Sequence, residues 1–122
     1  MQVLKTETPN INDRIEQFEG SIFLNVGKQI QRIPLKRIEY IKGYGDYMKV
    51  KCKERSHTVH VTMKNLQKIL PSTDFYRVHK SYIIRLDKIE KVFPKHVEID
   101  DTNIPISRNN KQELLSLIPW VK

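Results

Sequence analysis

Short runs of alternating apolar and polar residues fill most of the chain from Ser21 onward. A period-two pattern over about four to eight residues predicts a half-buried β-strand. The runs are SIFLNV, QIQRIP, RIEYIK, YMKVKCK, HTVHVT, FYRVH, YIIRL, KIEKVF, HVEID and NIPIS, with turn residues between them. Because these runs do not alternate with long helices, they predict a single, mostly β domain with antiparallel strands.

Two of these runs show how the strand faces are expected to divide. In RIEYIK, the alternation predicts one face with Ile38, Tyr40 and Lys42. In YMKVKCK, the apolar face has Met48, Val50 and Cys52, and the opposite face has Lys49, Lys51 and Lys53. The pattern predicts that Cys52 is packed in the interior. The lysine face fits either a solvated strand surface or contact with a polyanion.

Two segments break the period-two pattern and indicate short helices. In MKNLQKIL, apolar residues recur at helical spacing, Thr62 can cap the first turn and Pro71 ends the helix. The last helix is expected to have Ser107 as its N-cap and to end at Pro119. Its apolar side consists of Leu114, Leu115, Leu117 and Ile118.

The first 20 residues differ in composition from the rest. Residues 1–20 are polar and acidic, with at most a short helix over residues 11–18, and they predict a linker or an N-terminal extension. Residues 21–122 are then expected to form one domain, because 122 residues are too few for two domains of ordinary size.

Charge narrows the range of partners. The chain has 22 Lys and Arg against 14 Asp and Glu, a formal net charge of +8. Residues 1–20 carry two cations and four acids, so residues 21–122 carry +10. This excess favours a polyanionic partner, although a basic composition also serves solubility alone. With a single cysteine and no apolar run near the roughly 20 residues of a membrane span, we expect a cytoplasmic protein.

The sequence contains few residue patterns that would indicate a catalytic or metal-binding site. None of the four histidines, His57, His60, His79 and His96, has cysteines or carboxylates at the spacing of a zinc site. The pair Asp100 and Asp101 precedes Thr-Asn, which predicts an ordinary turn between strands. The four glycines form no phosphate-binding loop. We therefore expect no enzyme, no metal and no cofactor.

Three separated segments together resemble the LytTR family of bacterial DNA-binding domains. The stretch FYRVHKSYIIRLDKIEKV resembles the family signature, IPLKRIEYIKGYGDYMKV its opening strands, and IPISRNNKQEL its closing strand and helix. The signature positions are Phe75, Arg77, Val78, His79, Lys80, Ser81, Tyr82, Ile83, Ile84 and Ile89. Residues 21–118 are covered in total. Arg85 departs from the pattern, because the family usually has Asn there.

The resemblance implies a β-rich domain that reads the major groove of promoter DNA through loops instead of a recognition helix. Family members are commonly output domains of two-component response regulators, which implies a phosphorelay and an upstream receiver domain in the full-length protein. Members typically bind pairs of direct repeats in double-stranded DNA, an arrangement compatible with a homodimer on DNA. The implied role is transcription regulation.

The resemblance also assigns roles to individual residues. Base contacts are expected from Arg108, Lys80 and Tyr47, and Arg108 is the strongest candidate because a guanidinium can bridge O6 and N7 of guanine. Contacts to the DNA backbone are assigned to Asn109, Asn110, Lys111, Lys49 and Arg77. For Arg77, an internal packing role is an open alternative. His79 and Ser81 are assigned to structuring the turn.

Two other classes of function stay open. The basic charge equally suits an RNA-binding module, for which Tyr44, Tyr47 and Tyr76 are the available stacking platforms. The third class is a signalling or protein-interaction domain without DNA binding. In that case, replacing Arg108 with Ala would leave promoter affinity unchanged.

Overall fold

A computed structural model describes residues 10–122 of the chain. The first half contains α1 (Ile11–Gln17), β1 (Ser21–Val26), β2 (Gln29–Pro34), β3 (Ile38–Tyr44), β4 (Tyr47–Cys52), β5 (Ser56–Val59) and α2 (Met63–Ile69). The second half contains β6 (Phe75–His79), β7 (Tyr82–Arg85), β8 (Lys91–Val92), β9 (His96–Ile99), β10 (Thr102–Pro105) and α3 (Lys111–Ser116). Short 3₁₀ turns, Leu35–Arg37 and Leu86–Lys88, precede β3 and β8.

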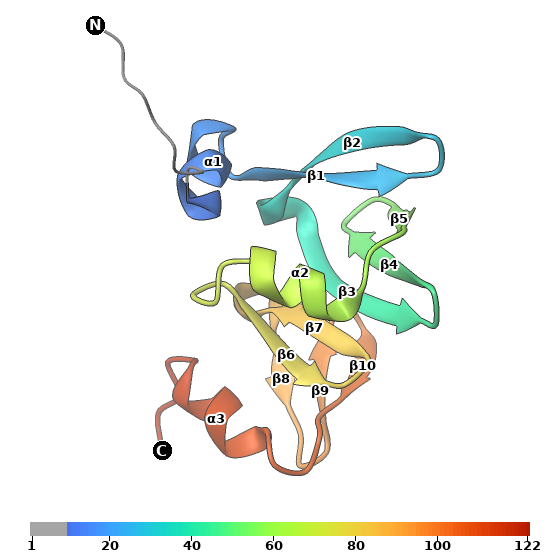
Figure 1. Ribbon diagram of the computed structural model, residues 1–122. Coiled ribbons are helices and arrows are strands. Elements are labelled where there is room, and N and C mark those ends of the chain that lie inside the picture. Colours follow the sequence, from blue (N-terminus) through green and yellow to red (C-terminus); the bar gives the residue numbers. More distant parts are fainter. Residues whose placement is uncertain (1–9) are drawn as a thin grey trace, which may run out of the picture.

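The strands form three antiparallel sheets. The central sheet has five strands in the order β5-β4-β3-β7-β6, and the flanking sheets are the β1-β2 hairpin and the three-stranded β10-β9-β8. In Figure 1 the β1-β2 hairpin lies above the central sheet, β8, β9 and β10 overlap β6 and β7 of that sheet, and α3 lies at the lower left. The prediction of a mostly β, antiparallel domain is confirmed.

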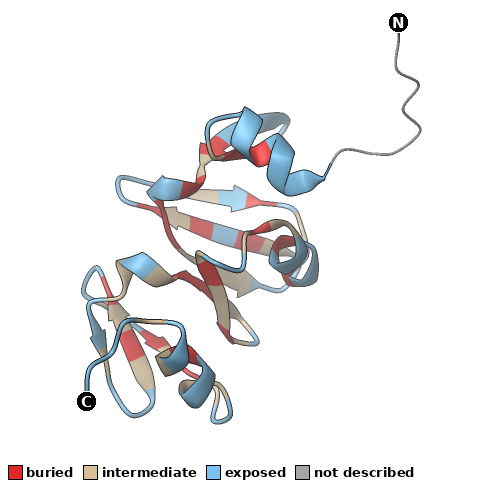
Figure 2. Cartoon of the chain, turned by 90° about the vertical axis from the view of Figure 1, so that its left-hand side faces the viewer, coloured by how far each residue is buried: buried red, intermediate tan, exposed pale blue. Residues whose placement is uncertain are grey.

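The domain has two hydrophobic clusters instead of the single core that its length suggested. The larger cluster combines α1, β1, β2 and α2 with residues of the central sheet such as Ile41 and Val50. The smaller one combines β9, β10 and α3 with Val78 and Ile84, and Tyr40, Tyr76 and Tyr82 pack against it. Figure 2 shows the buried positions concentrated on the strands, while the helices are largely exposed. The middle strands of the central sheet therefore contribute to both clusters.

A bulge in β3 corrects the predicted strand face. Ile38 lies opposite Cys52 and Tyr40 lies opposite Lys51, so the register shifts at Glu39. The additional residue inverts the alternation. Ile38 is consequently buried with Ile41 in the larger cluster, while Tyr40 packs on the smaller one. The expectation that Ile38 and Tyr40 share a face is wrong.

The bulge places a carboxylate inside the protein, and a lysine from β4 pairs with it. The Glu39 side chain is 9% exposed, and its Oε1 atom lies 3.3 Å from Lys51 Nζ. Lys51 also donates to the Cys52 carbonyl at 2.9 Å and lies 3.7 Å from Asp100 Oδ2 in the β9-β10 turn. Lys51 thus belongs to an internal network and not to a free lysine face. Cys52 is buried, as the alternation predicted.

The helices agree with the sequence in part. The Thr62 hydroxyl caps α2 by accepting from the Asn65 N–H at 3.1 Å, as predicted. Helix α3 begins at Lys111 and not directly after Ser107, because residues 108–110 form a separate turn in which the Asn110 N–H donates to the Ser107 carbonyl at 2.9 Å. Helix α1 has Ile15 buried in the larger cluster. Residues 1–9 of the predicted linker lie outside the described residues.

Candidate nucleic-acid interface

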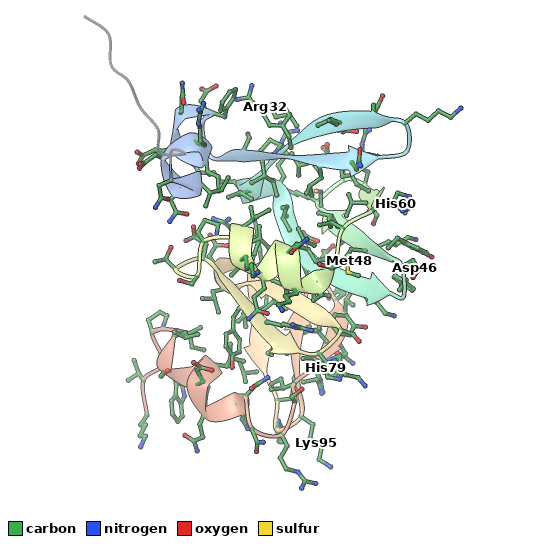
Figure 3. All side chains as sticks on the ribbon, viewed as in Figure 1. Arg32, Asp46, Met48, His60, His79 and Lys95 are labelled. Atoms are coloured by element: carbon green, nitrogen blue, oxygen red, sulfur yellow. The ribbon has the colours of Figure 1, made fainter. Side chains whose placement is uncertain are left out.

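Four loops that are distant in sequence lie along one side of the molecule. They are residues 44–47 between β3 and β4, residues 79–82 between β6 and β7, residues 93–96 between β8 and β9, and residues 106–111 before α3. Figure 3 labels Asp46, His79 and Lys95, which mark three of these loops on the right and lower side. We call these four loops the basic connection surface.

Backbone hydrogen bonds fix these loops to one another. The Gly43 N–H donates to the Ser81 carbonyl at 2.8 Å, which ties the end of β3 to the β6-β7 turn. The Ser107 N–H donates to the Val78 carbonyl at 3.0 Å, and the Ile106 N–H donates to the Lys95 carbonyl at 2.9 Å. The side chains of the surface are therefore presented from a preformed frame, which reduces the ordering cost of binding.

The β6-β7 turn is held from inside by two side chains. The Ser81 N–H donates to His79 Nδ1 at 3.0 Å, a contact that supports the turn-structuring roles of His79 and Ser81. Arg77 donates to the Lys80 carbonyl at 2.7 Å and to Gln67 Oε1 at 3.0 Å. Both terminal nitrogens of Arg77 are thus engaged within the protein, which favours the packing role that the sequence left open. Lys80 itself is exposed at the tip.

Aromatic rings and lysines are interleaved at the β3-β4 turn. Gly45 has a φ of 70°, a conformation that glycine adopts without strain. The rings of Tyr44 and Tyr47 stack with centroids 5.6 Å apart. The Lys42 ammonium lies 4.8 Å from the Tyr44 ring and 5.7 Å from the Tyr82 ring, so it connects this turn to the β6-β7 turn. The Tyr44 side chain, and then that of Tyr82, raises the pKa of Lys42.

The loop before α3 presents some side chains outward and others inward. Arg108 and Asn109 are exposed. Asn110 points inward, because its Nδ2 donates to the Val78 carbonyl at 3.1 Å and its own carbonyl accepts from the Tyr76 hydroxyl at 3.3 Å. Through these contacts, Asn110 has a structural role: it docks α3 on β6.

The Tyr76 hydroxyl also takes part in the contact between β6 and α3. It donates to Glu113 Oε1 at 2.9 Å. Burial, followed by the hydrogen bond and charge of Glu113, raises the pKa of Tyr76 to about 12. Its ring packs against the smaller cluster. Tyr76 is therefore not a free stacking platform.

The structure brings most of the predicted contact residues together and adds others. Tyr47, Lys80 and Arg108 all lie on the basic connection surface, and Lys111 lines a pocket with Arg108 and Lys95. Sequence reasoning missed Lys42 and Lys95. Position in the Pro94-Lys95 turn was the available signal for Lys95, whereas no sequence pattern marks Lys42 as a bridge between turns.

These features define a class of protein: a small β domain that presents cations from strand connections, with no long recognition helix among residues 10–122. The comparison with known families agrees with this class. The profile of the LytTr DNA-binding domain family matches residues 28–118. The chain belongs to this family, which confirms the resemblance noted in the sequence.

Relatives and solved structures support the assignment. The chain is 32% identical over 106 residues to the sensory transduction protein LytT of Bacillus subtilis, covering 82% of this chain and 44% of that protein. It is 26% identical over 101 residues to LytT of Bacillus cereus, covering 78% and 41%. The chain thus spans less than half the length of these relatives.

A solved structure shares the fold. It is the LytTr DNA-binding domain of a putative methyl-accepting/DNA response regulator from Bacillus cereus, with a TM-score of 0.71 at 18% identity. The match covers 83% of this chain and 98% of that one.

Over residues 10–122, no three or more His, Cys, Asp or Glu side chains are grouped to hold a metal ion. Within the same range, no helix has the length and apolar character needed to cross a membrane.

Arg85, the residue that departs from the family pattern, is internal. It is 8% exposed. Its Nη1 donates to the Leu35 carbonyl at 3.1 Å, its Nε donates to Asp87 Oδ1 at 2.8 Å, and its guanidinium lies 5.3 Å from the Phe75 ring. The guanidinium thus joins β7 to the turn before β3 and does not face the basic connection surface.

Replacing Arg85 with Ala is expected to lower the free energy of unfolding by about 2 kcal/mol, since a buried charged hydrogen bond and a cation–π contact are lost. The DNA affinity of the folded protein should not change. Urea unfolding and DNA titration measure the two effects, with the exposed Lys64→Ala as a stability control. A tenfold loss of DNA affinity without a loss of stability would place Arg85 at the DNA instead.

Proposed function

We propose that this chain is a sequence-specific DNA-binding domain that regulates transcription by placing the basic connection surface in the major groove. One observation carries the proposal: loops distant in sequence are joined by backbone hydrogen bonds and together expose cations along one side. Because the chain belongs to a family of DNA-binding domains, DNA is the partner proposed for that surface. Rigid presentation of cations suits a duplex of fixed shape.

The residues divide by chemistry into readers and positioning contacts. Arg108 reads guanine, since its two terminal nitrogens match the O6 and N7 acceptors. Lys80 and Tyr47 contact bases from the other two turns. Phosphates are contacted by the polar side chains around them, namely the exposed Lys49, Lys95 and Asn109 and the half-buried Lys111. Arg77 and Asn110, which the resemblance assigned to the DNA backbone, hold the frame instead.

The full-length protein is proposed to be a cytoplasmic response regulator. The similarity to LytT sensory transduction proteins, of which this chain spans less than half, supports an additional receiver domain upstream. Residues 1–20 would connect the two domains. Binding to direct repeats, with two copies side by side on the DNA, completes the proposal.

RNA binding is the less favoured alternative. Single-stranded bases need accessible aromatic faces. Tyr76 is committed to α3, and Tyr44 and Tyr47 are stacked on each other. A duplex contacted through cations requires no such face.

The function is tested by fluorescence anisotropy on duplexes from upstream of the gene's own operon, compared with random duplex. A preference of about 10³ is expected for the cognate site. Arg108→Lys keeps the charge but loses the two parallel N–H donors of the guanidinium. It should therefore weaken cognate binding by about 1 to 3 kcal/mol and relax the sequence specificity. Lys80→Ala should also weaken cognate binding.

Lys95→Ala is the matched control, because loss of a phosphate contact weakens all sequences alike. If the wild-type protein bound the upstream duplexes no more tightly than random duplex, the proposal of sequence-specific binding would be wrong. Unchanged affinity in Arg108→Ala would favour the signalling or protein-interaction alternative.

A further inference from the structure

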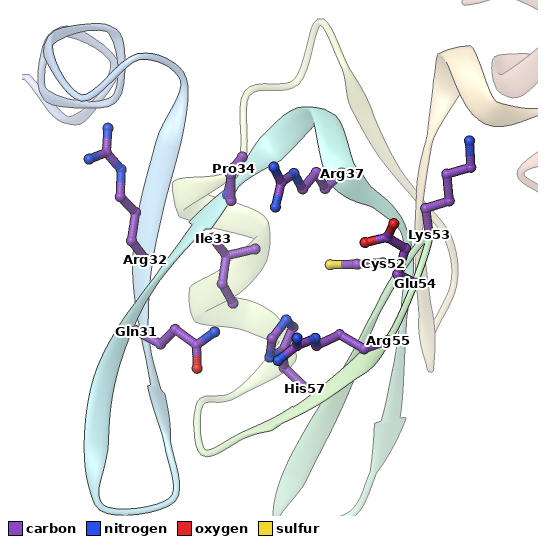
Figure 4. A pocket seen from close by; sticks show the side chains of 10 residues that line it. All are labelled: Gln31, Arg32, Ile33, Pro34, Arg37, Cys52, Lys53, Glu54, Arg55 and His57. Atoms are coloured by element: carbon purple, nitrogen blue, oxygen red, sulfur yellow. The ribbon is translucent and has the colours of Figure 1, made fainter.

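A second concave, basic site lies at the opposite end of β4 from the DNA-facing turn. Its volume is about 380 Å³, and β2, the turn before β3 and the β4-β5 connection form its walls. The residues that line it are Gln31, Arg32, Ile33, Pro34, Arg37, Cys52, Lys53, Glu54, Arg55 and His57. Figure 4 shows the side chains of Arg37 and Arg55 extending across the space toward β2, with Arg32 and Lys53 directed away from it.

The two central arginines have no anionic partner in the described part of the chain. Arg32 donates to the Phe18 carbonyl at 2.9 Å and pairs with Glu19 at 3.5 Å. By contrast, no hydrogen bond or ion pair of the Arg37 or Arg55 side chain occurs within residues 10–122. Two guanidinium groups that face one cavity repel each other, and an anion between them would relieve this repulsion.

The inner wall of the cavity is apolar or neutral. Ile33 is 1% exposed and Cys52 is 5% exposed, so both contribute only a small surface there. Burial, followed by the charge of Arg55, lowers the pKa of His57. The site thus combines four cations, the single carboxylate of Glu54, an imidazole and apolar contact, in a volume typical of small-ligand pockets.

The site is separate from the basic connection surface. Tyr47 and Cys52 are the two ends of β4, and at about 3.3 Å per residue they lie roughly 16 Å apart. A straight duplex held by the loops at one end of β4 does not fill a cavity at its other end.

We propose that this cavity binds a small phosphate-bearing molecule through Arg37 and Arg55. Guanidinium groups donate paired hydrogen bonds that match phosphate oxygens, which favours this chemistry over a simple halide. Ile33 and Pro34 would pack against the uncharged part of the molecule. The proposal rests on the cavity alone and does not depend on the proposed DNA binding.

The test is an NMR titration of the ¹⁵N-labelled chain with pyrophosphate and, separately, with adenosine monophosphate. Amide shifts are expected at residues 31–33 and 52–57. The pKa of His57 should rise when the cavity is filled, since a nearby negative charge favours imidazolium. Tighter binding of the nucleotide would identify an organic phosphate, and tighter binding of pyrophosphate an inorganic one; both results support the site.

The double variant Arg37→Ala, Arg55→Ala should weaken binding at least tenfold. The double variant Lys28→Ala, Lys36→Ala removes the same charge from exposed positions outside the cavity and should bind normally. Equal weakening in both variants would overturn the proposal, because it would indicate general electrostatic attraction. Shifts confined to residues 79–82 and 106–111 would also overturn it.

A third measurement separates the cavity from DNA binding. The Arg37→Ala, Arg55→Ala variant should keep its promoter affinity, whereas Arg108→Ala should not. If the cavity variant lost as much DNA affinity as Arg108→Ala, the cavity would be a DNA contact and the proposal would fail. If no DNA bound but pyrophosphate did, the proposed function would fail and the anion site would stand.

Discussion

Raising the salt concentration from 50 to 200 mM is expected to weaken binding to duplex DNA about a thousandfold. About six cations lie on or beside the basic connection surface, namely Lys42, Lys49, Lys80, Lys95, Arg108 and Lys111. A cation that reads a base in the groove also neutralises phosphate charge, as does a cation in direct contact with a phosphate. Each neutralised phosphate releases counterions and contributes roughly −0.9 to the slope of log K against log salt, so about six cations give a slope near −5. Anisotropy titrations at several salt concentrations measure this slope.

Single variants show which cations contribute to it. Lys95→Ala should make the slope shallower by about one, because it removes one phosphate contact. Arg37→Ala, at the other end of β4, should leave the slope unchanged. A wild-type slope shallower than about −2 would mean that this surface does not follow the DNA backbone.

Replacing Lys51 with Met is expected to lower the free energy of unfolding by about 2 to 4 kcal/mol. Methionine retains much of the volume but leaves the Glu39 carboxylate, 9% exposed, without its cation. Breaking a buried ion pair costs about 3 to 5 kcal/mol, and the 27% exposure of Lys51 lets water compensate for part of this loss. Urea unfolding followed by circular dichroism gives the value.

Lys49→Met is the matched control, because Lys49 lies on the same strand but is exposed and should change stability by less than about 0.5 kcal/mol. Equal losses in the two variants would refute a special role for the internal pair.

The pH dependence of the free energy of unfolding gives a second check on the Glu39–Lys51 pair. Burial lowers the pKa of Lys51, but Glu39 and then Asp100 outweigh this effect and raise it above 10.5. The contribution of the pair is therefore complete below pH 10.5 and is lost as the pH rises through the folded-state pKa.

Local patterns predicted the elements well and their exceptions poorly. Alternation identified the strands of the three sheets, and Thr62 marked the start of α2. The bulge at Glu39 escaped detection because it depends on Lys51 and on packing against both clusters. The late start of α3 escaped for a similar reason, since the turn before it is held by the Asn110 side chain on the Val78 carbonyl of β6, which is distant in sequence. The pattern of one strand contains no information about either partner.

The same reasoning applies to the interface. Resemblance located Lys80 and Arg108, whose positions next to a turn and a helix are readable from sequence. It could not show that Arg77 and Asn110 point inward, because their acceptors, the carbonyls of Lys80 and Val78, come into reach only in the folded chain. Lys42 lies beside the surface because Tyr44 and Tyr82 flank it in space.

The pairing of β3 with β7 has a consequence for how the protein folds. Tyr40 lies opposite Ile84, and β4, β5, α2 and β6 all lie between them in the chain. Closing so long a loop costs conformational entropy before any contact compensates for it, so this pairing should form late and limit the folding rate. The bond from Gly43 to Ser81 lies at the end of that pairing. A partly folded chain would therefore have its separate hairpins but no joined surface, and DNA recognition would begin only with the last step of folding.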